Sequence, residues 1–253
     1  MIELGTEDLE ERAGQADARS AEEAAHALAR RLKPLEGKPS GVLMVHEIYR
    51  SLQGESTFAG LPCVFVRLTA CHLRCVYCDT PHAFQQGEPI GLDEVIDRAL
   101  DLGDELVEIT GGEPLLQDEV YPLMARLADL GKTVLLETSG AVDTSRVDPR
   151  VRIILDLKTP GSGELNANVW SNLDRLKATD EVKFVLCSRD DFDWAVDVVR
   201  RFDLAGRCPI LFSAVFGQVD PTDLAAWILE ARAPVRLQLQ MHKILWGPKG
   251  RGV

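Results

Sequence analysis

Short apolar runs alternate with longer segments of helical periodicity along the chain after about residue 42. The apolar runs predict strands, which lie near 63–69, 106–110, 133–138, 152–157, 182–187 and 209–214, with a further strand possible at 235–240. The longer segments predict helices over 92–102, 116–130, 167–177, 190–203 and 221–232. Strands that alternate with helices are typical of βα units around a parallel sheet.

About six such units are too few to close an eight-stranded barrel. We therefore expect an α/β fold whose sheet stays open, as a partial barrel of the (β/α)6 type. Ligand sites in such folds form where loops leave the carboxyl ends of the strands. The polar segments described below all follow predicted strands.

Residues 1–41 differ from the rest of the chain because they are charged and lack β-branched runs. The segment Ser20-Ala-Glu-Glu23 is a capping box that predicts a helix start, and Pro34 predicts its end. The apolar face of this helix would comprise Ala21, Ala25, Leu28 and Leu32. We expect residues 1–41 to be an N-terminal helical extension, without chemistry, that packs on the domain over 42–253 or on a partner subunit.

Composition and charge exclude several classes of protein. A net charge of −12 and a pI near 4.9 oppose binding to a nucleic-acid backbone. Apolar runs stay below the roughly 18 to 20 residues that a membrane span needs, and the N-terminus lacks a secretion signal. Six cysteines are too sparse for a disulfide scaffold, and three of them fall within eight positions. We expect a cytoplasmic protein that uses these three cysteines for metal or cluster ligation.

The cysteine cluster Cys71-His-Leu-Arg-Cys75-Val-Tyr-Cys78 directly follows the strand predicted at 63–69. Three thiolates on a four-iron cube leave the fourth iron open, which suggests a bound substrate or cofactor. Structural zinc is the alternative, but His72 or His82 would then have to supply the fourth ligand. The other cysteines, Cys63, Cys187 and Cys208, lie in or beside apolar strands and are expected to be ordinary buried thiols.

The Cys-x3-Cys-x2-Cys loop, with the aromatic Tyr77 before the third cysteine, resembles the loop of radical S-adenosylmethionine (SAM) enzymes. The resemblance implies that Cys71, Cys75 and Cys78 hold a [4Fe–4S] cluster and that SAM binds its fourth iron. Reduction then yields a 5′-deoxyadenosyl radical that abstracts hydrogen from the substrate. It also implies cofactor contacts for Tyr77 and Asp79.

Further segments at predicted strand ends resemble cofactor-binding motifs of the same superfamily. In Glu108-Ile-Thr-Gly-Gly-Glu-Pro114, two glycines allow a close approach of the backbone and a carboxylate can accept from an ammonium group. The cofactor contacts implied are Gly111, Gly112, Glu113, Glu137, Ser139, Asp156, Lys158 and Ser213. The sequence departs from the motif after Ser213, because Ala214 stands where a Pro is usual. The alternatives are a plain Gly-Gly turn and ion pairs at the rim of the sheet.

Two further segments indicate which family of radical SAM enzymes the chain resembles. They are His46-Glu-Ile-Tyr-Arg-Ser-Leu-Gln-Gly-Glu55, before the first predicted strand, and Gln240-Met-His-Lys-Ile-Leu-Trp246. With Arg67 and the ending Arg251-Gly-Val253, they resemble the family of 7-carboxy-7-deazaguanine synthases from about residue 45 onward. The resemblance implies a lyase that contracts the ring of 6-carboxy-5,6,7,8-tetrahydropterin, with loss of ammonia, in queuosine and related 7-deazapurine biosynthesis.

The same resemblance assigns the substrate side of the site. Arg67 would clamp the pterin carboxylate, and the hydroxyl group of Thr80 would contact Mg²⁺. The remaining substrate contacts implied are Leu52, Gln53, Gly54, Glu55, Thr110, His242 and the terminal carboxyl group of Val253. Lys243 and Trp246 would help to close the pocket. The family also implies a homodimer and an electron donor such as flavodoxin or ferredoxin.

Two other functions remain open at this level. A glycyl-radical activating enzyme shares the cysteine spacing but acts on a protein, and the Leu52-Gln-Gly-Glu55 segment argues against it. A noncatalytic iron–sulfur or zinc module would use Gly111-Gly112 only as a turn, and it would not cleave SAM.

Overall fold

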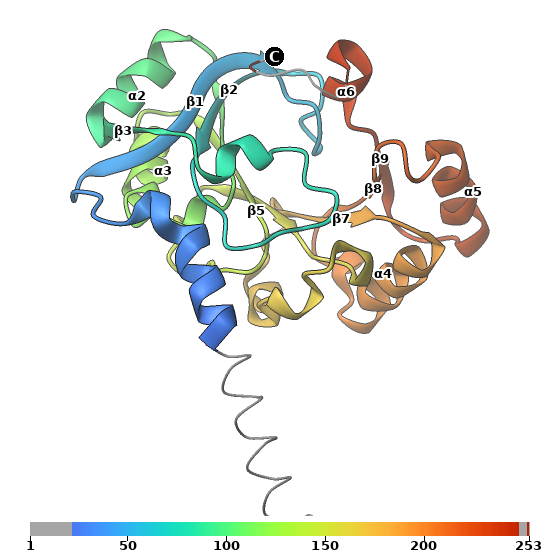
Figure 1. The fold of residues 1–253 in the computed structure, drawn as a ribbon. Coiled ribbons are helices and arrows are strands. Elements are labelled where there is room, and N and C mark those ends of the chain that lie inside the picture. Colours follow the sequence, from blue (N-terminus) through green and yellow to red (C-terminus); the bar gives the residue numbers. More distant parts are fainter. Residues whose placement is uncertain (1–21, 248–251, 253) are drawn as a thin grey trace, which may run out of the picture.

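One sheet runs through the molecule in the computed structural model, which describes residues 22–247 and 252 (Figure 1). Its strands are β1 (Val42–Leu52), β2 (Pro62–Leu68), β3 (Glu88–Gly91), β4 (Leu106–Gly111), β5 (Thr133–Thr138), β6 (Arg152–Asp156), β7 (Glu181–Leu186), β8 (Ile210–Ala214) and β9 (Arg236–Gln238). The α-helices that follow them are α2 (Leu92–Asp101), α3 (Val120–Asp129), α4 (Arg189–Arg201), α5 (Pro221–Ala231) and α6 (Met241–Trp246).

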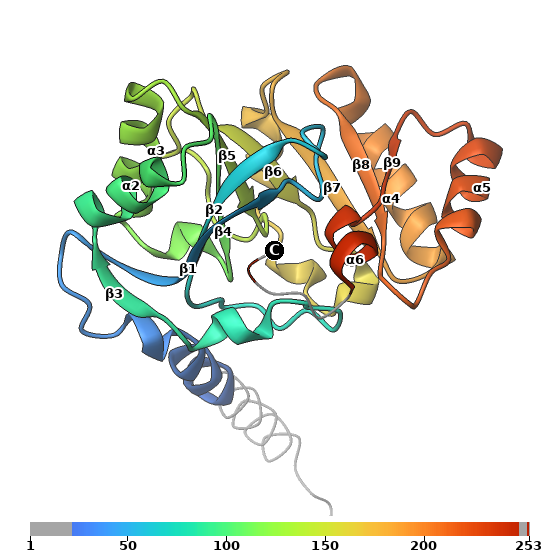
Figure 2. The same cartoon turned by 90° about the horizontal axis from the view of Figure 1, so that it is seen from above.

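The sheet is open. Its order is β3-β1-β2-β4-β5-β6-β7-β8-β9. The seven strands β2, β4, β5, β6, β7, β8 and β9 pair in parallel with one another in that order. Strand β1 is antiparallel to both β2 and β3. Seen from above, the sheet curves around a central space, with α2 to α5 outside it (Figure 2). The predicted open partial barrel is confirmed.

The predicted barrel strands match β2 and β4 to β8 closely, because each is a mostly buried apolar run bounded by polar or turn residues. The further strand at 235–240 is present as the shorter and more exposed β9. Strands β1 and β3 were not predicted from the sequence, and the segment expected before the first strand lies largely in β1. The helix predicted over 167–177 was wrong. That region forms two 3₁₀ turns, Leu165–Ala167 and Trp170–Arg175. Helix α3 starts later than predicted, after the 3₁₀ turn Pro114–Leu116.

Side chains alternate between two environments along the parallel strands. Outward-facing residues such as Val64 and Val66 on β2 join the main core under the helices. Inward-facing residues near the strand starts form a second apolar cluster, which comprises Cys63, Phe65, Leu106, Leu135 and Ile154. Further along the same strands the inward positions become polar, at Arg67, Glu108 and Glu137. The barrel interior thus changes from apolar to charged toward its carboxyl end.

The N-terminal helix is described from residue 22 to 32, and it ends at the 3₁₀ turn that contains Pro34, as predicted. Ser20 and Ala21 of the predicted cap and face lie outside the described residues. Ala25 is exposed and Leu28 is 44% exposed, so this part of the expected apolar face does not pack on the domain. Between residues 22 and 247, the described helices include none with the length and apolar character needed to cross a bilayer.

Candidate active site

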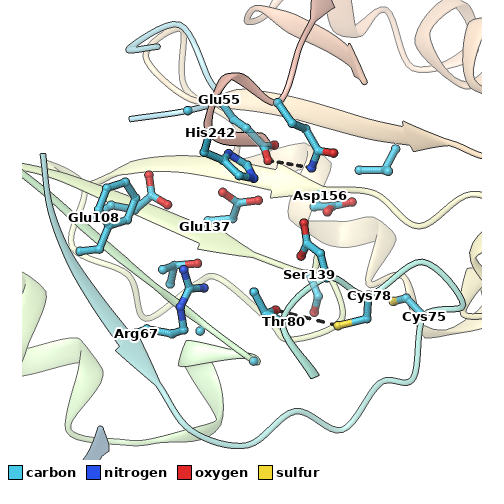
Figure 3. A pocket seen from close by; sticks show the side chains of 18 of the residues that line it. Glu55, Arg67, Cys75, Cys78, Thr80, Glu108, Glu137, Ser139, Asp156 and His242 are labelled. Carbon is cyan, nitrogen blue, oxygen red and sulfur yellow. Dashed lines mark hydrogen bonds between the residues drawn. The ribbon is translucent and has the colours of Figure 1, made fainter. Parts of the chain in front are cut away.

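A cavity of about 240 Å³ lies at the carboxyl ends of the parallel strands. Most of the predicted site residues line it: Leu52, Gln53, Gly54, Glu55, Arg67, Cys71, Cys75, Tyr77, Cys78, Asp79, Thr80, Thr110, Gly111, Gly112, Glu137, Ser139, Asp156, Lys158 and His242. The thiols of Cys75 and Cys78 lie on one side, opposite Glu55 and His242 (Figure 3). The fold therefore brings both predicted halves of the site into one space.

The cysteine loop is held from outside by two segments that are remote in sequence. The guanidinium Nη1 of Arg31, on the N-terminal helix, donates to the carbonyl oxygen of His72 at 2.6 Å. The backbone N–H of Arg74 donates to Glu164 Oε1 at 2.5 Å, and the N–H of Val76 donates to the carbonyl oxygen of Ser162 at 3.0 Å. These bonds fix the backbone between the cysteines without using the thiols.

The thiols themselves suit a cluster better than a zinc ion. All six cysteines of the chain are described, and none forms a disulfide bond. The sulfur atoms of Cys71, Cys75 and Cys78 do not all lie within 4.8 Å of one another, and neither His72 nor His82 joins them in a convergent ligand group. A four-iron cube separates its thiolates more widely than one tetrahedral zinc ion does. Cys63, Cys187 and Cys208 are buried, as predicted.

Two glycines bring strand β4 against the start of the cysteine loop. Gly111 has φ of +148°, and a Cβ atom there would lie 2.2 Å from the carbonyl oxygen of Leu68. A Cβ atom on Gly112 would lie 2.2 Å from the carbonyl oxygen of Ala70 and 2.8 Å from Cys71 Cβ. Side chains at these positions are excluded sterically, which leaves bare backbone beside the thiols.

Glu113 is fully buried and does not line the cavity. Its carboxylate accepts hydrogen bonds from Leu115 N–H at 3.0 Å, Thr138 Oγ1 at 2.9 Å, and Ser139 N–H and Oγ at 2.8 and 2.5 Å. In this structure Glu113 therefore positions Ser139 at the cavity wall. Ser213 is also buried away from the wall, and Val253 lies outside the described residues.

The floor of the cavity is a buried network of charges around Lys183, whose side chain is 4% exposed. Its ammonium group lies 2.8 Å from Glu55 Oε2 and 3.9 Å from Asp156 Oδ2, and it donates to Glu137 Oε1. Burial alone would lower the pKa of Lys183, but Glu137 and Glu55 raise it well above its ordinary value. Burial alone would raise the pKa of Glu55, but the nearby charges of Lys183 and His242 lower it to about 2.

Glu108 lies beneath this network on β4 and accepts from Gln53 Nε2. Burial, and next the neighbouring Glu137, raises the pKa of Glu108 well above its ordinary value. Gln53 also accepts from Glu55 N–H at 2.9 Å through Oε1, and its backbone pairs with Leu61 and Gly60 at 2.8 Å. Gln53 is 2% exposed. Its polar groups thus fix the turn that carries Glu55.

The turn after β1 meets helix α6 across the cavity. The N–H of Met241 donates to the carbonyl oxygen of Gly54 at 2.9 Å, and Gln240 Nε2 donates to Glu55 Oε1 at 3.0 Å. A Cβ atom on Gly54 would lie 2.4 Å from His242 Nδ1, so a larger residue there would force the His242 side chain to move. The two segments that the family resemblance singled out are therefore in direct contact.

Arg67 extends from β2 into the cavity (Figure 3). Its Nε donates to Glu47 Oε1 at 2.8 Å and its Nη2 to Tyr49 Oη at 3.0 Å, which holds the guanidinium group in place. An arginine has five N–H donors, so these two contacts leave donors for an acidic ligand. The arrangement can bind a carboxylate.

Near the thiols, buried polar atoms lack partners among the described residues. Lys158 Nζ lies 3.0 Å from Asp156 Oδ2, but Asp156 Oδ1 and the hydroxyl group of Tyr77 make no hydrogen bond. Thr80 is partly buried, and its hydroxyl group lies 3.9 Å from Cys78 Sγ, within hydrogen-bonding distance of that sulfur (Figure 3). Buried polar groups are normally paired, so the unpaired atoms of Asp156 and Tyr77 fit a polar ligand that also contacts the cysteine loop.

Lys183 and Glu108 are the main residues of the site that were not predicted from the sequence. Each is a charged residue within an apolar strand, Val182-Lys183-Phe184 and Val107-Glu108-Ile109. A charged residue within a buried strand can be recognised from the sequence, and it indicates a buried ion pair or a ligand site, because buried charges need partners. The sequence pattern does not identify those partners.

Comparison with known proteins decides the family. The model of the radical SAM superfamily matches residues 66–220. The 7-carboxy-7-deazaguanine synthase of Chlorobaculum tepidum is 45% identical to this chain over 214 residues, which cover 83% of this chain and 97% of that protein. The corresponding synthase of Koribacter versatilis is 44% identical and is covered in full. The chain belongs to the radical SAM superfamily, within the 7-carboxy-7-deazaguanine synthase family.

A solved structure supports the fold of this family member independently. The crystal structure of QueE from Escherichia coli aligns with a TM-score of 0.67 at 23% identity, and the alignment covers 83% of this chain and 99% of that chain. The predictions of the family and of a radical SAM enzyme with a [4Fe–4S] cluster and SAM are confirmed. Such an enzyme needs a reductant and acts on a small-molecule substrate.

The bond from Arg31 to the cysteine loop predicts a role for the N-terminal helix. Arg31→Ala removes a charged donor from a loop carbonyl group, a loss of about 1 kcal/mol. We expect the reconstituted cluster to decay roughly three- to tenfold faster in air, as measured by iron–sulfur absorbance and iron per chain. The exposed neighbour Arg30 offers the matched control, and Arg30→Ala should decay like the unmodified chain. Equal decay of all three proteins would contradict this role.

Glu108 predicts a pH dependence of stability. The pKa of Glu108 is raised in the folded state. Its contribution to the free energy of unfolding is therefore fully present below the ordinary pKa of a glutamate, and it is lost as the pH rises toward the pKa of Glu108 in the folded protein. Glu108→Gln keeps an acceptor for Gln53 and cannot ionise. We expect equal stability at pH 5 within about 1 kcal/mol and a more stable variant at pH 8, measured by urea unfolding. Glu105→Gln, at a side chain 83% exposed, should show no such gain.

Proposed function

We propose that this chain converts 6-carboxy-5,6,7,8-tetrahydropterin into 7-carboxy-7-deazaguanine with loss of ammonia, in the biosynthesis of queuosine and related 7-deazapurines. The supporting observation is that one cavity contains both the three cysteines and the segments around Glu55, Arg67 and His242. The relatives that carry the synthase name match over nearly their whole length. A radical superfamily site and a substrate site thus share one space.

In the proposed cofactor site, Cys71, Cys75 and Cys78 hold the cluster. The bound cluster and SAM supply a 5′-deoxyadenosyl radical for hydrogen abstraction. Gly111 and Gly112 line the cavity beside the thiols, where their backbone can contact a ligand. The other proposed contacts are Tyr77, Asp79, Glu137, Ser139, Asp156 and Lys158 at the wall, with Glu113 and Ser213 behind it.

In the proposed substrate site, Arg67 binds the pterin carboxylate through the donors that Glu47 and Tyr49 leave available. Leu52, Gly54, Glu55, Thr110 and His242 surround the ring, and Gln53 holds the turn in shape.

Glu55 stays ionised because Lys183 lies 2.8 Å away, so it can accept from the N–H groups of a flat heterocycle. Val253 is proposed as a further contact.

The remaining assignments rest on the family resemblance. We propose Mg²⁺ binding by Thr80, whose hydroxyl group faces the same cavity. We also propose a homodimer and a flavodoxin or ferredoxin as reductant. Residues 42–253 form the proposed catalytic domain, and residues 1–41 an added extension. A cytoplasmic location suits thiols that must stay reduced to hold a cluster.

The function is tested by turnover. The protein is reconstituted anaerobically with iron and sulfide, reduced, and mixed with SAM and 6-carboxytetrahydropterin. We expect 7-carboxy-7-deazaguanine and 5′-deoxyadenosine by mass analysis, and Cys75→Ala should abolish cluster and products together. If only 5′-deoxyadenosine forms, the pterin is not the substrate. If neither forms from protein with four irons per chain, the proposed enzyme activity is wrong.

Arg67 provides a specific test of the substrate assignment. Arg67→Ala removes a charged clamp, worth about 2 to 3 kcal/mol, so kcat/KM for the pterin should fall roughly 30- to 150-fold. Iron content should stay unchanged. The matched control is Arg50→Ala, which breaks an exposed ion pair with Asp104 outside the cavity. Normal kinetics of Arg67→Ala would refute the assignment.

A further inference from the structure

Strand β1 contains an irregularity beside the cavity. The pairing of β1 with β2 shifts register between Val45 and Glu47, which marks a bulge at His46. Neighbouring side chains on a regular strand point to opposite faces, but a bulge can re-aim one of them. Here His46 and Glu47 both approach His82, which lies in the 3₁₀ turn Pro81–Phe84 after the cysteine loop.

The three side chains converge. One ligand atom each from His46, Glu47 and His82 lies within 4.8 Å of the other two, and all three residues are partly buried. The two imidazole rings are 5.0 Å apart between centroids and tilted by 48°, so they do not stack. Bonds of about 2.1 Å to a tetrahedral ion place ligand atoms roughly 3.4 Å apart. Small side-chain rotations therefore suffice to bring these atoms onto one ion.

The hydrogen bond of His46 prepares it as a ligand. Its Nδ1 lies 2.7 Å from the carbonyl oxygen of Gln86. A carbonyl oxygen only accepts, so Nδ1 carries the proton and Nε2 carries the lone pair. Histidines that bind metals usually donate their other ring N–H to such an acceptor, which fixes both tautomer and ring orientation.

Glu47 supplies the negative charge. Its Oε1 accepts from Arg67 Nε at 2.8 Å, which orients the carboxylate, and an ion can bind through the second oxygen. Two imidazoles and one carboxylate are the donors that zinc, cobalt and nickel prefer, whereas Mg²⁺ prefers oxygen donors alone.

We propose that His46, Glu47 and His82 form a binding site for a divalent transition-metal ion such as Zn²⁺. The site uses neither the three cysteines nor Thr80 as ligands. Glu47 and His82 line the cavity, as Arg67 does, so the ion sits at its wall. Because Glu47 also holds Arg67, the ion and Arg67 share one carboxylate.

The test measures zinc binding to the cluster-loaded protein, in which the cysteines are already occupied. Protein with four irons per chain is dialysed anaerobically against Zn²⁺ in excess Mg²⁺, and zinc and iron are counted by elemental analysis. We expect one zinc per chain with no loss of iron. His46→Ala and His82→Ala should each weaken zinc binding roughly 10- to 100-fold. Glu47→Gln, which keeps its shape and an acceptor for Arg67, should weaken it as well.

The control is His26→Ala, at an exposed histidine of the N-terminal helix, which should bind zinc like the unmodified chain. Iron content and thermal unfolding show that each variant is folded. The proposal fails if the loaded protein takes up no zinc, if zinc replaces iron, or if Mg²⁺ displaces it. It also fails if folded His46→Ala and Glu47→Gln bind zinc as tightly as the unmodified chain.

Discussion

The ammonium group of Lys183 is the interaction on which the interior of the barrel depends. It lies on β7 and joins Glu137 on β5, Asp156 on β6 and Glu55 on the turn after β1. Separate buried carboxylates would be expensive to hold without a cation, and a lone buried ammonium group would be equally so. Lys183 therefore ties three strands and one loop together at the depth where the cavity begins.

The charge network also explains how one fold carries two binding tasks. Below Glu108 the inward residues are apolar, and above the network they are polar and partly unsatisfied. The cysteine loop and the glycines of β4 surround the cofactor side, whereas Glu55, Arg67 and His242 surround the substrate side. Lys183 lies between the sets, since its partner Glu55 belongs to one and its partner Asp156 to the other. The two sites are thus built on a shared rigid floor.

Much of this arrangement is predictable because its signals are local. The cysteine loop and the Gly111-Gly112 turn are short motifs at the ends of apolar strands, so parallel strands bring them to one edge. Strand β1 was not predicted because polar and apolar residues do not alternate regularly along it, and a bulge interrupts its pairing with β2.

The segment 167–177 has helical spacing, but Asn172 donates its side-chain N–H groups to the carbonyl oxygen of Val142 at 2.9 Å and to that of Gly140 at 3.4 Å. These bonds hold the segment in 3₁₀ turns. Contacts between remote residues, such as Arg31 with His72, have no signature in the sequence.

The most direct test of this account is the unfolding free energy of Lys183→Met, measured in urea at neutral pH beside the double variant Lys183→Met/Glu137→Gln. Removing one partner of a buried ion pair costs about 3 to 5 kcal/mol, and neutralising Glu137 should restore part of that loss. Those are the predicted results. A single variant as stable as the unmodified chain, or a double variant no more stable than the single one, would contradict the central place given to Lys183.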